Sequence, residues 1–454
     1  MEDMNSGMRG TIADAVPVDK LDHVFFSTGT AFLGTIDSMK KHIQQYAELV
    51  VQVGTALKQG QNLLIQTGVG TFDFAREIAR AAYRRGAGFV DIRVVDNELL
   101  KARLELADEQ TLDYVPPAVI ADSYQQLAED WARIRIDSTE ELDVLKGVDS
   151  AKLGRVTRAN RSALSVHRDA MMRHKHQWLV IAAPGPRWAQ KVFGGPEVGV
   201  DPRLDEERTE KLWSQMVKIL RLDTPDPVAT WQDLAKTLKT RAKSLDEMKL
   251  DYLHFTGPGT DLKVALTETS VWAGGPSKTP EGTVFEPNLP TEEVFTTPDF
   301  RRTSGRVACT RPVKVMESLV LGAWFEFKDG KVVDFGADQG KDVLEKYLTV
   351  DEGAGYLGEV ALVDASSPIY QSGLLFNSIL YDENASCHIA LGAGYPFCLS
   401  NAHDLNSPAQ LKEAGCNVSL VHTDFMIGSP EVDVTGVSKN GEEHAVIRQG
   451  SFVL

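Results

Sequence analysis

The sequence predicts a chain of α/β and α+β architecture, in which an N-terminal parallel-sheet α/β domain is followed by a strand-rich mixed α+β domain. A strand, a helix and a second strand follow one another between residues 62 and 95, and this βαβ pattern requires a parallel sheet. From about residue 250 the long helical periods give way to alternating apolar and polar residues, as in antiparallel hairpins. We therefore expect an N-terminal extension over 1–40, an α/β domain over 41–250 and a second domain over 251–454.

The elements of the first half are predicted from apolar spacing and from glycine or proline at their ends. Apolar residues recur at three- and four-residue steps between Met39 and Val53, ahead of Gly54. The predicted elements are a helix over 38–54, a strand over 62–66, a helix over 72–85, a strand over 88–95, several helices over 108–173, a strand over 178–183 and helices over 206–221 and 228–248. The turn at Gly68 and Gly70 lacks the third glycine of a dinucleotide fingerprint, and no P-loop lysine follows, so we expect no nucleotide site there.

The second half is predicted to consist mainly of strands, with a hairpin first. These strands lie over 252–255, 261–266, 310–315, 319–328, 332–337 and 420–426. Within the first half, His174-Lys-His176 raises the question of a phosphate or metal site. Side chains two apart at a helix end point in different directions, so we expect a solvated turn.

The composition excludes several classes of protein. With 64 acidic and 48 basic side chains the net charge is −16, which repels the phosphates of nucleic acid. No run approaches the roughly 18 apolar residues of a membrane helix, and the first residues do not resemble a secretory signal. The 4 cysteines form no CxxC pair, so we expect reduced thiols in a cytoplasmic protein.

Carboxylates and histidines gather in the second half, beside turn residues or apolar strands. The segments are Asn288-Leu-Pro-Thr-Glu292-Glu293-Val-Phe295, Leu357-Gly-Glu359-Val-Ala-Leu-Val363, Tyr381-Asp-Glu383-Asn-Ala-Ser-Cys-His388 and His422-Thr-Asp424. Glu359 enters a strongly apolar strand, where a carboxylate must be paired or bind a metal. His422 and Asp424 would share one face of a strand, and at least one of Glu292 and Glu293 must face inward.

Each of these residues also has a purely structural interpretation when taken singly. An acidic pair after proline is commonly a solvated cap, and a lone histidine is commonly a hydrogen-bonded core residue. Together, however, the carboxylates and histidines exceed the ligand set of one tetrahedral zinc ion, and they suit two divalent cations that share a bridging carboxylate. Because cysteine is scarce in these segments, zinc, cobalt or manganese is favoured over sulfur-selective metals.

These segments resemble the aminopeptidase T / aminopeptidase S family of metallopeptidases. The similarity lies in residues 288–299, 357–363, 376–388 and 422–436, and extends to Leu253-His-Phe-Thr-Gly-Pro-Gly-Thr-Asp-Leu262 and Leu145-Lys-Gly-Val-Asp149. It runs from about residue 42 to the C-terminus, so only the N-terminal extension falls outside it.

The resemblance implies a dinuclear metal site in the second domain. Its ligands here would be Glu293, Glu359, His388, His422 and Asp424. Glu383 would be a further ligand or a partner of one, and Glu292 could exchange roles with Glu293. Tyr395 matches the family tyrosine near the metals and is expected to donate a hydrogen bond to the developing oxyanion. A carboxylate of the Glu292–Glu293 pair is expected to shuttle the proton.

The resemblance therefore implies a metalloexopeptidase, namely a metal-dependent aminopeptidase that releases N-terminal residues from peptides. The attacking water would be activated between two divalent ions (zinc, cobalt or manganese). Its expected partners are peptides with a free N-terminus and a second copy of the chain, with which it would form a homodimer. Neither nucleic acid nor a membrane is expected as a partner. Two rivals stay open. His388, His422 and Asp424 could form the mononuclear iron triad of a dioxygenase on a related fold, or the site could be a non-catalytic metal-binding scaffold.

Overall fold

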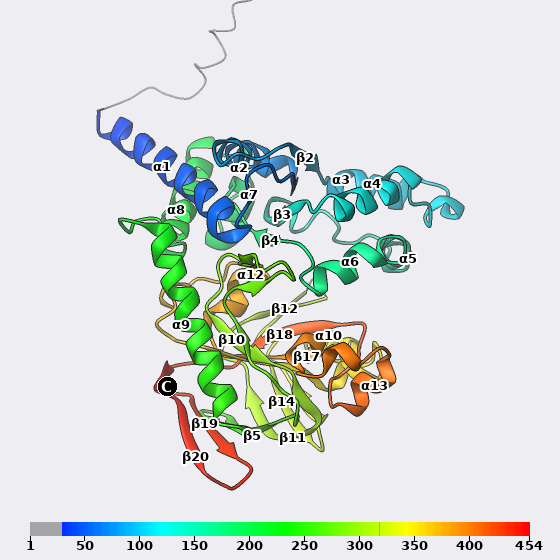
Figure 1. The fold of residues 1–454 in the computed structure, drawn as a ribbon. Coiled ribbons are helices and arrows are strands. Elements are labelled where there is room, and N and C mark those ends of the chain that lie inside the picture. The colour runs from blue at the N-terminus through cyan, green and yellow to red at the C-terminus, as the bar shows by residue number, and fades with distance from the viewer. Residues whose placement is uncertain (1–29, 317) are drawn as a thin grey trace, which may run out of the picture. The chain divides into compact units, whose positions relative to one another are not determined.

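The computed structural model describes residues 30–316 and 318–454 (Figure 1). Of the extension expected over 1–40, residues 1–29 lie outside the described residues. Helix α1 (Thr30–Leu49) continues into a π-helical turn, η2 (Val50–Gly54), so the predicted helix does end at Gly54. Residues 42–454 group into one unit, and the domain boundary near residue 250 stays a prediction.

The first half contains the predicted parallel sheet, with the strand order β2-β1-β3-β4. Its strands are β1 (Leu63–Thr67), β2 (Val90–Val94), β3 (Ala132–Ile136) and β4 (Trp178–Ile181). Its helices are α2 (Phe72–Arg84), α3 (Asn97–Leu106), α4 (Pro117–Ala128), α5 (Ser150–Ala163), α6 (Ser165–Met172), α7 (Pro186–Phe193), α8 (Pro202–Ile219) and α9 (Pro227–Glu247). The prediction of helices alone over 108–173 is wrong at β3, where Ala132, Ile134 and Ile136 are buried and alternate with two arginines.

The second half contains two larger antiparallel sheets, which confirms the mixed α/β and α+β class. Their strand orders are β18-β17-β16-β10-β7 and β15-β14-β11-β6-β5-β19-β20-β21. The strands of the first are β7 (Ala273–Gly274), β10 (Glu293–Thr296), β16 (Leu357–Val363), β17 (His388–Gly392) and β18 (His422–Met426). Those of the second are β5 (Leu250–Gly257), β6 (Thr260–Leu266), β11 (Pro298–Ala308), β14 (Trp324–Lys328), β15 (Lys331–Gly336), β19 (Asp433–Ser438), β20 (Glu443–Arg448) and β21 (Ser451–Phe452).

Two of the predicted strands are shorter than expected. The segment 310–315 contributes only β12 (Val313–Val315), which pairs with β13 (Ser318–Val320). The segment 319–328 is divided between β13 and β14, because Gly322 between them has a φ of 61°, a left-handed conformation that interrupts a strand. The remaining helices of this half are α10 (Lys341–Leu348), α11 (Pro368–Gln371), α12 (Ile379–Asp382) and α13 (Pro408–Glu413).

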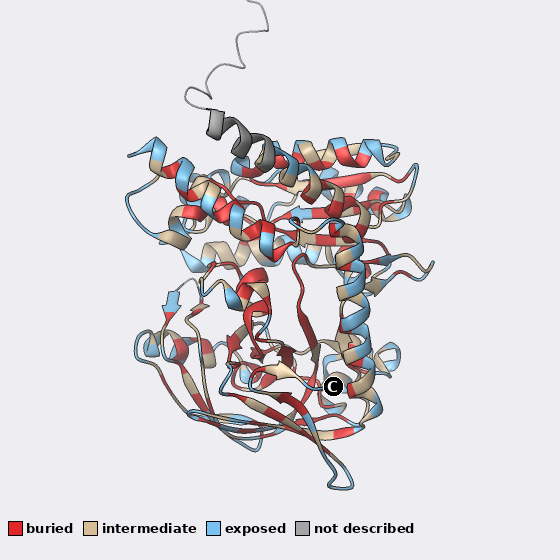
Figure 2. Cartoon of the chain, turned by 90° about the vertical axis from the view of Figure 1, so that its left-hand side faces the viewer, coloured by how far each residue is buried: buried red, intermediate tan, exposed pale blue. Residues whose placement is uncertain are grey.

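The main hydrophobic core lies between the two antiparallel sheets. Val294 of β10 pairs with Leu362 of β16. Val360 of β16 pairs with Ile389 of β17, which pairs with Phe425 of β18, and all five side chains join the core cluster. The opposing sheet contributes side chains such as Phe255 and Phe325. Figure 2 shows the buried residues concentrated in the interior strands and the exposed residues on outer helices and hairpin ends. The strand β16 is buried along its whole length, so its other face must also be covered.

Two smaller findings concern the composition-based expectations. Cys309, Cys387, Cys398 and Cys416 are free thiols. Within residues 30–316 and 318–454, no helix is long and apolar enough to cross a membrane.

The segment His174-Lys-His176 is a turn, as predicted, but the expectation that it is solvated is wrong. His176 is only 3% exposed, and its ring lies 5.3 Å from that of the buried His167. The guanidinium of Arg133 contacts His167. Burial first, and the charge of Arg133 second, lower the pKa of His167 to about 3 and that of His176 to about 4.

These two histidines make stability fall in acid. In the unfolded chain they take up protons below about pH 6.5, whereas in the folded chain they stay neutral until about pH 4 and pH 3. The unfolded state therefore gains stability as the pH falls through this window. We expect the thermal midpoint of the metal-free protein to decline less steeply between pH 7 and pH 4.5 in His176→Gln than in the wild type. His403→Gln, at an exposed position, should keep the wild-type slope; equal slopes in all three proteins would contradict the prediction.

Candidate metal centre

The sheet register places the predicted ligands of β16, β17 and β18 on one face. Glu359 and Asp424 both lie opposite Ala390, and residues directly opposite in antiparallel strands point to the same side. His388 is two residues from Ala390, and His422 is two residues from Asp424, so both share this side. This face is opposite to the one from which Val360, Ile389 and Phe425 enter the hydrophobic core.

The adjacent glutamates at the start of β10 diverge. Glu293 pairs in register with Val363, four residues from Glu359, and so joins the same face. Glu292 forms a buried ion pair with Arg221 at 2.7 Å, and its backbone N–H donates to Asn384 Oδ1. The fold thus brings Glu293, and not Glu292, to the other candidate ligands.

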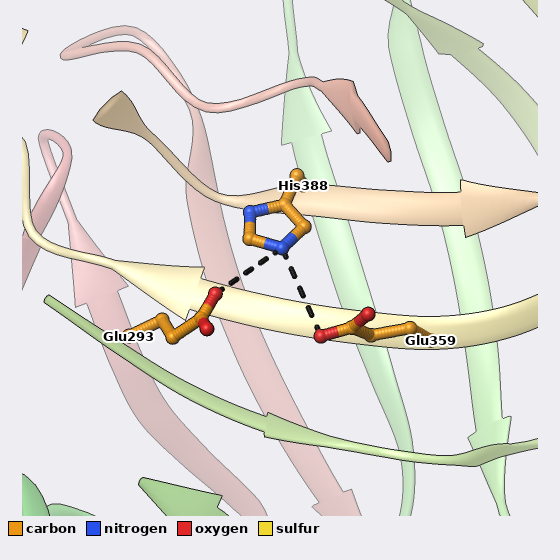
Figure 3. A group of neighbouring side chains, drawn as sticks. All are labelled: Glu293, Glu359 and His388. Carbon is orange, nitrogen blue, oxygen red and sulfur yellow. Dashed lines mark ion pairs between the residues drawn. The ribbon is translucent and has the colours of Figure 1, made fainter. Parts of the chain in front are cut away.

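The side chains form two overlapping groups that share Glu359. In one group, His388 Nε2 lies 3.3 Å from Glu293 Oε2 and 3.8 Å from Glu359 Oε1 (Figure 3). In the other, His422 Nε2 lies 3.2 Å from Glu359 Oε2 and 3.4 Å from Asp424 Oδ1. The ligand atoms of each group lie within 4.8 Å of one another. The two carboxylate oxygens of Glu359 therefore face different histidines, as in a carboxylate that bridges two metal ions.

The hydrogen bonds of the two histidine Nδ1 atoms turn each Nε2 towards the carboxylates. His388 Nδ1 donates to the carbonyl of Ser386 at 3.2 Å, and His422 Nδ1 donates to the carbonyl of Ala393 at 2.7 Å. Each Nε2 then faces carboxylate oxygens, and Glu293 Oε2 and Asp424 Oδ1 have no hydrogen-bond partner within the described residues. Buried polar atoms are normally satisfied, so these residues fit divalent cations placed between them.

The pKa values show how strongly these charges interact. Burial alone would lower the pKa of His388, but the hydrogen bond and charge of Glu359 together with the charge of Glu293 raise it to about 10. Burial raises the pKa of Glu293 to about 8. Burial would also raise the pKa of Asp424, yet His422 holds it below its usual range. A metal cation bound between these carboxylates and histidines would displace the protons that they hold, because metal ligands must be deprotonated.

The remaining predicted residues, Tyr395 and Glu383, lie beside the two groups. The hydroxyl of Tyr395 is 3.2 Å from His422 Nε2. Glu383 follows α12 and belongs to neither group; burial first, and the charges of Glu293 and Asp424 next, raise its pKa well above the usual value. Both side chains line a cavity of about 620 Å³ together with Glu293, Glu359 and His388.

This cavity is also lined by residues that were not among the predicted ligands. Its wall includes His174 and Trp178 from the first half, Lys239 from α9, and Glu286 ahead of β10. His174 belongs to the segment already considered as a phosphate or metal site, and Glu286 has a sequence signal because it directly follows the apolar pair Val284-Phe285, seven residues before Glu293. The others come from elements whose approach to the site depends on tertiary packing.

Gly392 fixes the pairing of the two histidine strands, so its replacement should disturb the site. It has a φ of 110°, and a Cβ there would lie well under 3.0 Å from the carbonyl oxygen of Val421. We expect Gly392→Ala to lower the free energy of unfolding by at least about 2 kcal/mol and to weaken metal binding, because Gly392 is paired with His422. Denaturant unfolding and a metal titration measure both effects.

Gly441→Ala is the matched control for this variant. Gly441 also has a positive φ, of 83°, but nothing lies within 4 Å of a Cβ built there. It should show only the conformational cost, about 1 kcal/mol, and unchanged metal affinity. Equal losses of stability in both variants, or an unchanged metal affinity in Gly392→Ala, would contradict the prediction.

Comparison with known proteins gives a consistent answer. The M29 peptidase family, described as thermophilic metalloprotease, matches residues 39–452. The chain is 37% identical over 420 residues to aminopeptidase T of Thermus aquaticus, which covers 92% of this chain and 100% of that protein. It is 38% identical over 415 residues to aminopeptidase 2 of Geobacillus stearothermophilus, covering 91% of this chain and 98% of the relative.

A solved structure supports the same relationship. Wild-type AmpT from Thermus thermophilus superposes with a TM-score of 0.83 at 36% identity, over 91% of this chain and 100% of that one. The family resemblance inferred from the motifs and the mixed α/β fold are both confirmed. The chain belongs to the M29 family of metalloproteases.

Proposed function

We propose that this protein is an aminopeptidase that releases N-terminal residues from peptides at a centre of two divalent metal ions, held by Glu293, Glu359, His388, His422 and Asp424. Metal-dependent aminopeptidase activity is supported by the family and by relatives that are themselves named aminopeptidases. The two-ion centre is supported by one observation above others. Glu359 presents one oxygen to each of two histidines, in two groups of candidate ligands.

Each side chain has a distinct part in the proposed reaction. Two divalent ions, when bound, would acidify a water molecule and polarise the first peptide carbonyl. Tyr395 would donate a hydrogen bond to the oxygen that becomes negative, since its hydroxyl is close to the ligand atom of His422. Glu383 lines the cavity without belonging to either ligand group, so it is placed to hold the proton released by water. Glu292 is not available for this transfer because Arg221 binds it.

Tyr395→Phe tests the oxyanion role. The variant keeps the ring, which stacks on Phe397 at 5.2 Å, and removes only the hydroxyl. We expect kcat to fall by about 10- to 1,000-fold with a KM close to that of the wild type, because the lost hydrogen bond forms mainly in the transition state. Tyr252→Phe, on β5, is the control for loss of a hydroxyl elsewhere and should leave both constants unchanged. A rise in KM at constant kcat would show that Tyr395 binds substrate instead.

The proposed function is tested with metal-loaded protein and two matched substrates, leucine-p-nitroanilide and its N-acetyl form. An aminopeptidase should hydrolyse the first and leave the second almost untouched, since acetylation removes the free amine. Dialysis against a chelator should abolish the reaction, and zinc, cobalt or manganese should restore it. Undiminished turnover in the metal-free protein would overturn the proposal.

The dioxygenase rival finds no support. The matched family and the relatives reported above are peptidases. His388 and His422 also belong to different groups, each completed by a glutamate, whereas a mononuclear iron triad needs both histidines and Asp424 around one ion. Metal analysis separates the possibilities: two divalent ions per chain support the peptidase, and one iron with oxygen uptake would support the rival. A metal content near zero would favour a non-metal scaffold.

Finer features of the function are also proposals. We infer zinc, cobalt or manganese from the oxygen and nitrogen ligands, and peptides with a free N-terminus as substrates. A homodimer and a cytoplasmic location are proposed from the family resemblance and from the free cysteines. Sedimentation and cell fractionation would test these two features.

A further inference from the structure

Glu286 is a buried carboxylate held in a fixed position on the cavity wall. It is only 2% exposed. Its backbone N–H donates to the carbonyl of Gly54 at 2.9 Å, and the next carbonyl, that of Pro287, accepts from the N–H of Val180 at 2.8 Å. The segment that carries Glu286 is therefore tied to the first half of the molecule on both sides.

The carboxylate of Glu286 is not paired with any residue that the structure describes. Its Oε2 atom is fully buried without a hydrogen bond, and no ion pair reaches it from the part of the chain that the structure describes. The nearest influence is the charge of Lys239, which acts from beyond ion-pair distance and does not offset burial, so the pKa of Glu286 rises to about 8. Because buried carboxylates are normally paired, this one has the properties of a ligand-binding group.

The surroundings of Glu286 connect it to the proposed metal centre. The same cavity of about 620 Å³ is lined by Glu286, by the candidate ligands Glu293, Glu359 and His388, and by Val284, which is 53% exposed. Glu286 thus shares one cavity with three of the proposed ligands. The aromatic rings of Trp178, Phe295 and Phe397 also line the cavity and would contact the aliphatic or guanidinium part of a side chain.

We propose that Glu286 binds the cationic side chain of an arginine or lysine residue near the N-terminus of the peptide substrate. This inference rests on the proposed function, because it concerns a peptide bound at the metal centre. An ammonium or guanidinium group would supply the hydrogen bond that Glu286 Oε2 lacks within the described residues. The cation belongs to the first or the second residue of the peptide, and the experiment distinguishes these positions.

The test compares arginine with norleucine, which has a similar linear stem and no charge. The metal-loaded wild type and Glu286→Gln are assayed with Arg-Ala-Ala, norleucine-Ala-Ala, Ala-Arg-Ala and Ala-norleucine-Ala, and the released residue is quantified. In the variant we expect kcat/KM for one arginine peptide to fall about 10- to 100-fold, while its norleucine partner changes less than about 3-fold. The peptide that loses activity assigns the position of the cation.

Glu281→Gln is the matched control, because Glu281 is exposed on the same segment and does not line the cavity. It should behave like the wild type with all four peptides. A uniform loss across the peptides in Glu286→Gln, or no loss at all, would overturn the proposal.

A binding measurement separates this proposal from the proposed function. Calorimetry with n-butylguanidinium and the metal-loaded protein should give saturable binding in the wild type and in Glu281→Gln, and at least about 10-fold weaker binding in Glu286→Gln. If no peptide is hydrolysed, the proposed function fails while this result still tests Glu286. If peptides are hydrolysed and butylguanidinium binds both variants equally, the proposal for Glu286 fails alone.

Discussion

His388→Ala should lower kcat/KM for leucine-p-nitroanilide by at least about 1,000-fold, which corresponds to about 4 kcal/mol of lost transition-state stabilisation. The imidazole is 1% exposed and is oriented by its hydrogen bond to Ser386, so that Nε2 faces Glu293 and Glu359. Alanine removes the only nitrogen donor of this group. Glu293 and Glu359 then face one another without the imidazole, and a cation between them would lack its nitrogen ligand. Steady-state kinetics and metal analysis of the purified variant measure the effect.

The control is His403→Ala, since the side chain of His403 is 77% exposed and lies outside the cavity. It should match the wild type in activity and metal content. Circular dichroism should show the same secondary structure in all three proteins. If His388→Ala retained more than about a tenth of the activity, with a normal metal content, His388 would not be a ligand.

Removal of the metal ions should lower the thermal midpoint by roughly 5–10 °C. The reason is the density of charge: Glu293, Glu359, Glu383 and Asp424 converge in a buried site, and two of their oxygens lack any hydrogen bond within the described residues. Ions that bind only the folded chain stabilise it by about 4 kcal/mol at a concentration of 1,000 times Kd. Calorimetric scans with chelator and with added zinc or manganese measure this shift.

Asp424→Asn tests the same dependence of the thermal midpoint on metal in a variant. The amide keeps the size of the side chain but removes one anionic ligand, so the shift on adding metal should shrink. Glu281→Gln removes an exposed charge of the same sign and should keep the full shift. Identical midpoints with and without metal in the wild type would contradict a metal centre of this kind.

Much of the candidate site could be predicted because it depends on local patterns. The strand around Glu359 is visible as an apolar run interrupted by one carboxylate, and the spacing of His422 and Asp424 implies a shared strand face. These inferences need only the two-residue period of a strand. The structure brings both sets of residues together.

The relations between distant segments could not be predicted in the same way. Nothing in the sequence near Glu292 shows that Arg221, at the end of α8, binds it and leaves Glu293 for the cluster. The register that places Glu359 and Asp424 opposite Ala390 is likewise a property of three paired strands. Strand β3 was missed because its arginines interrupt the apolar run, although its alternate residues are buried. Each of these features depends on contacts between segments that are far apart in the sequence.

The bridge between Val180 and Asn288 limits how the protein could be divided. Asn288 extends the parallel sheet of the first half as an edge residue, yet only five positions later the same segment supplies Glu293. A fragment that began near residue 250 would retain every proposed ligand in its sequence but lose the neighbouring strand that anchors one of them. The bridge therefore ties the first half directly to the segment that carries Glu293. Any recombination of this chain with a relative should keep β4 and the 284–293 segment from the same parent.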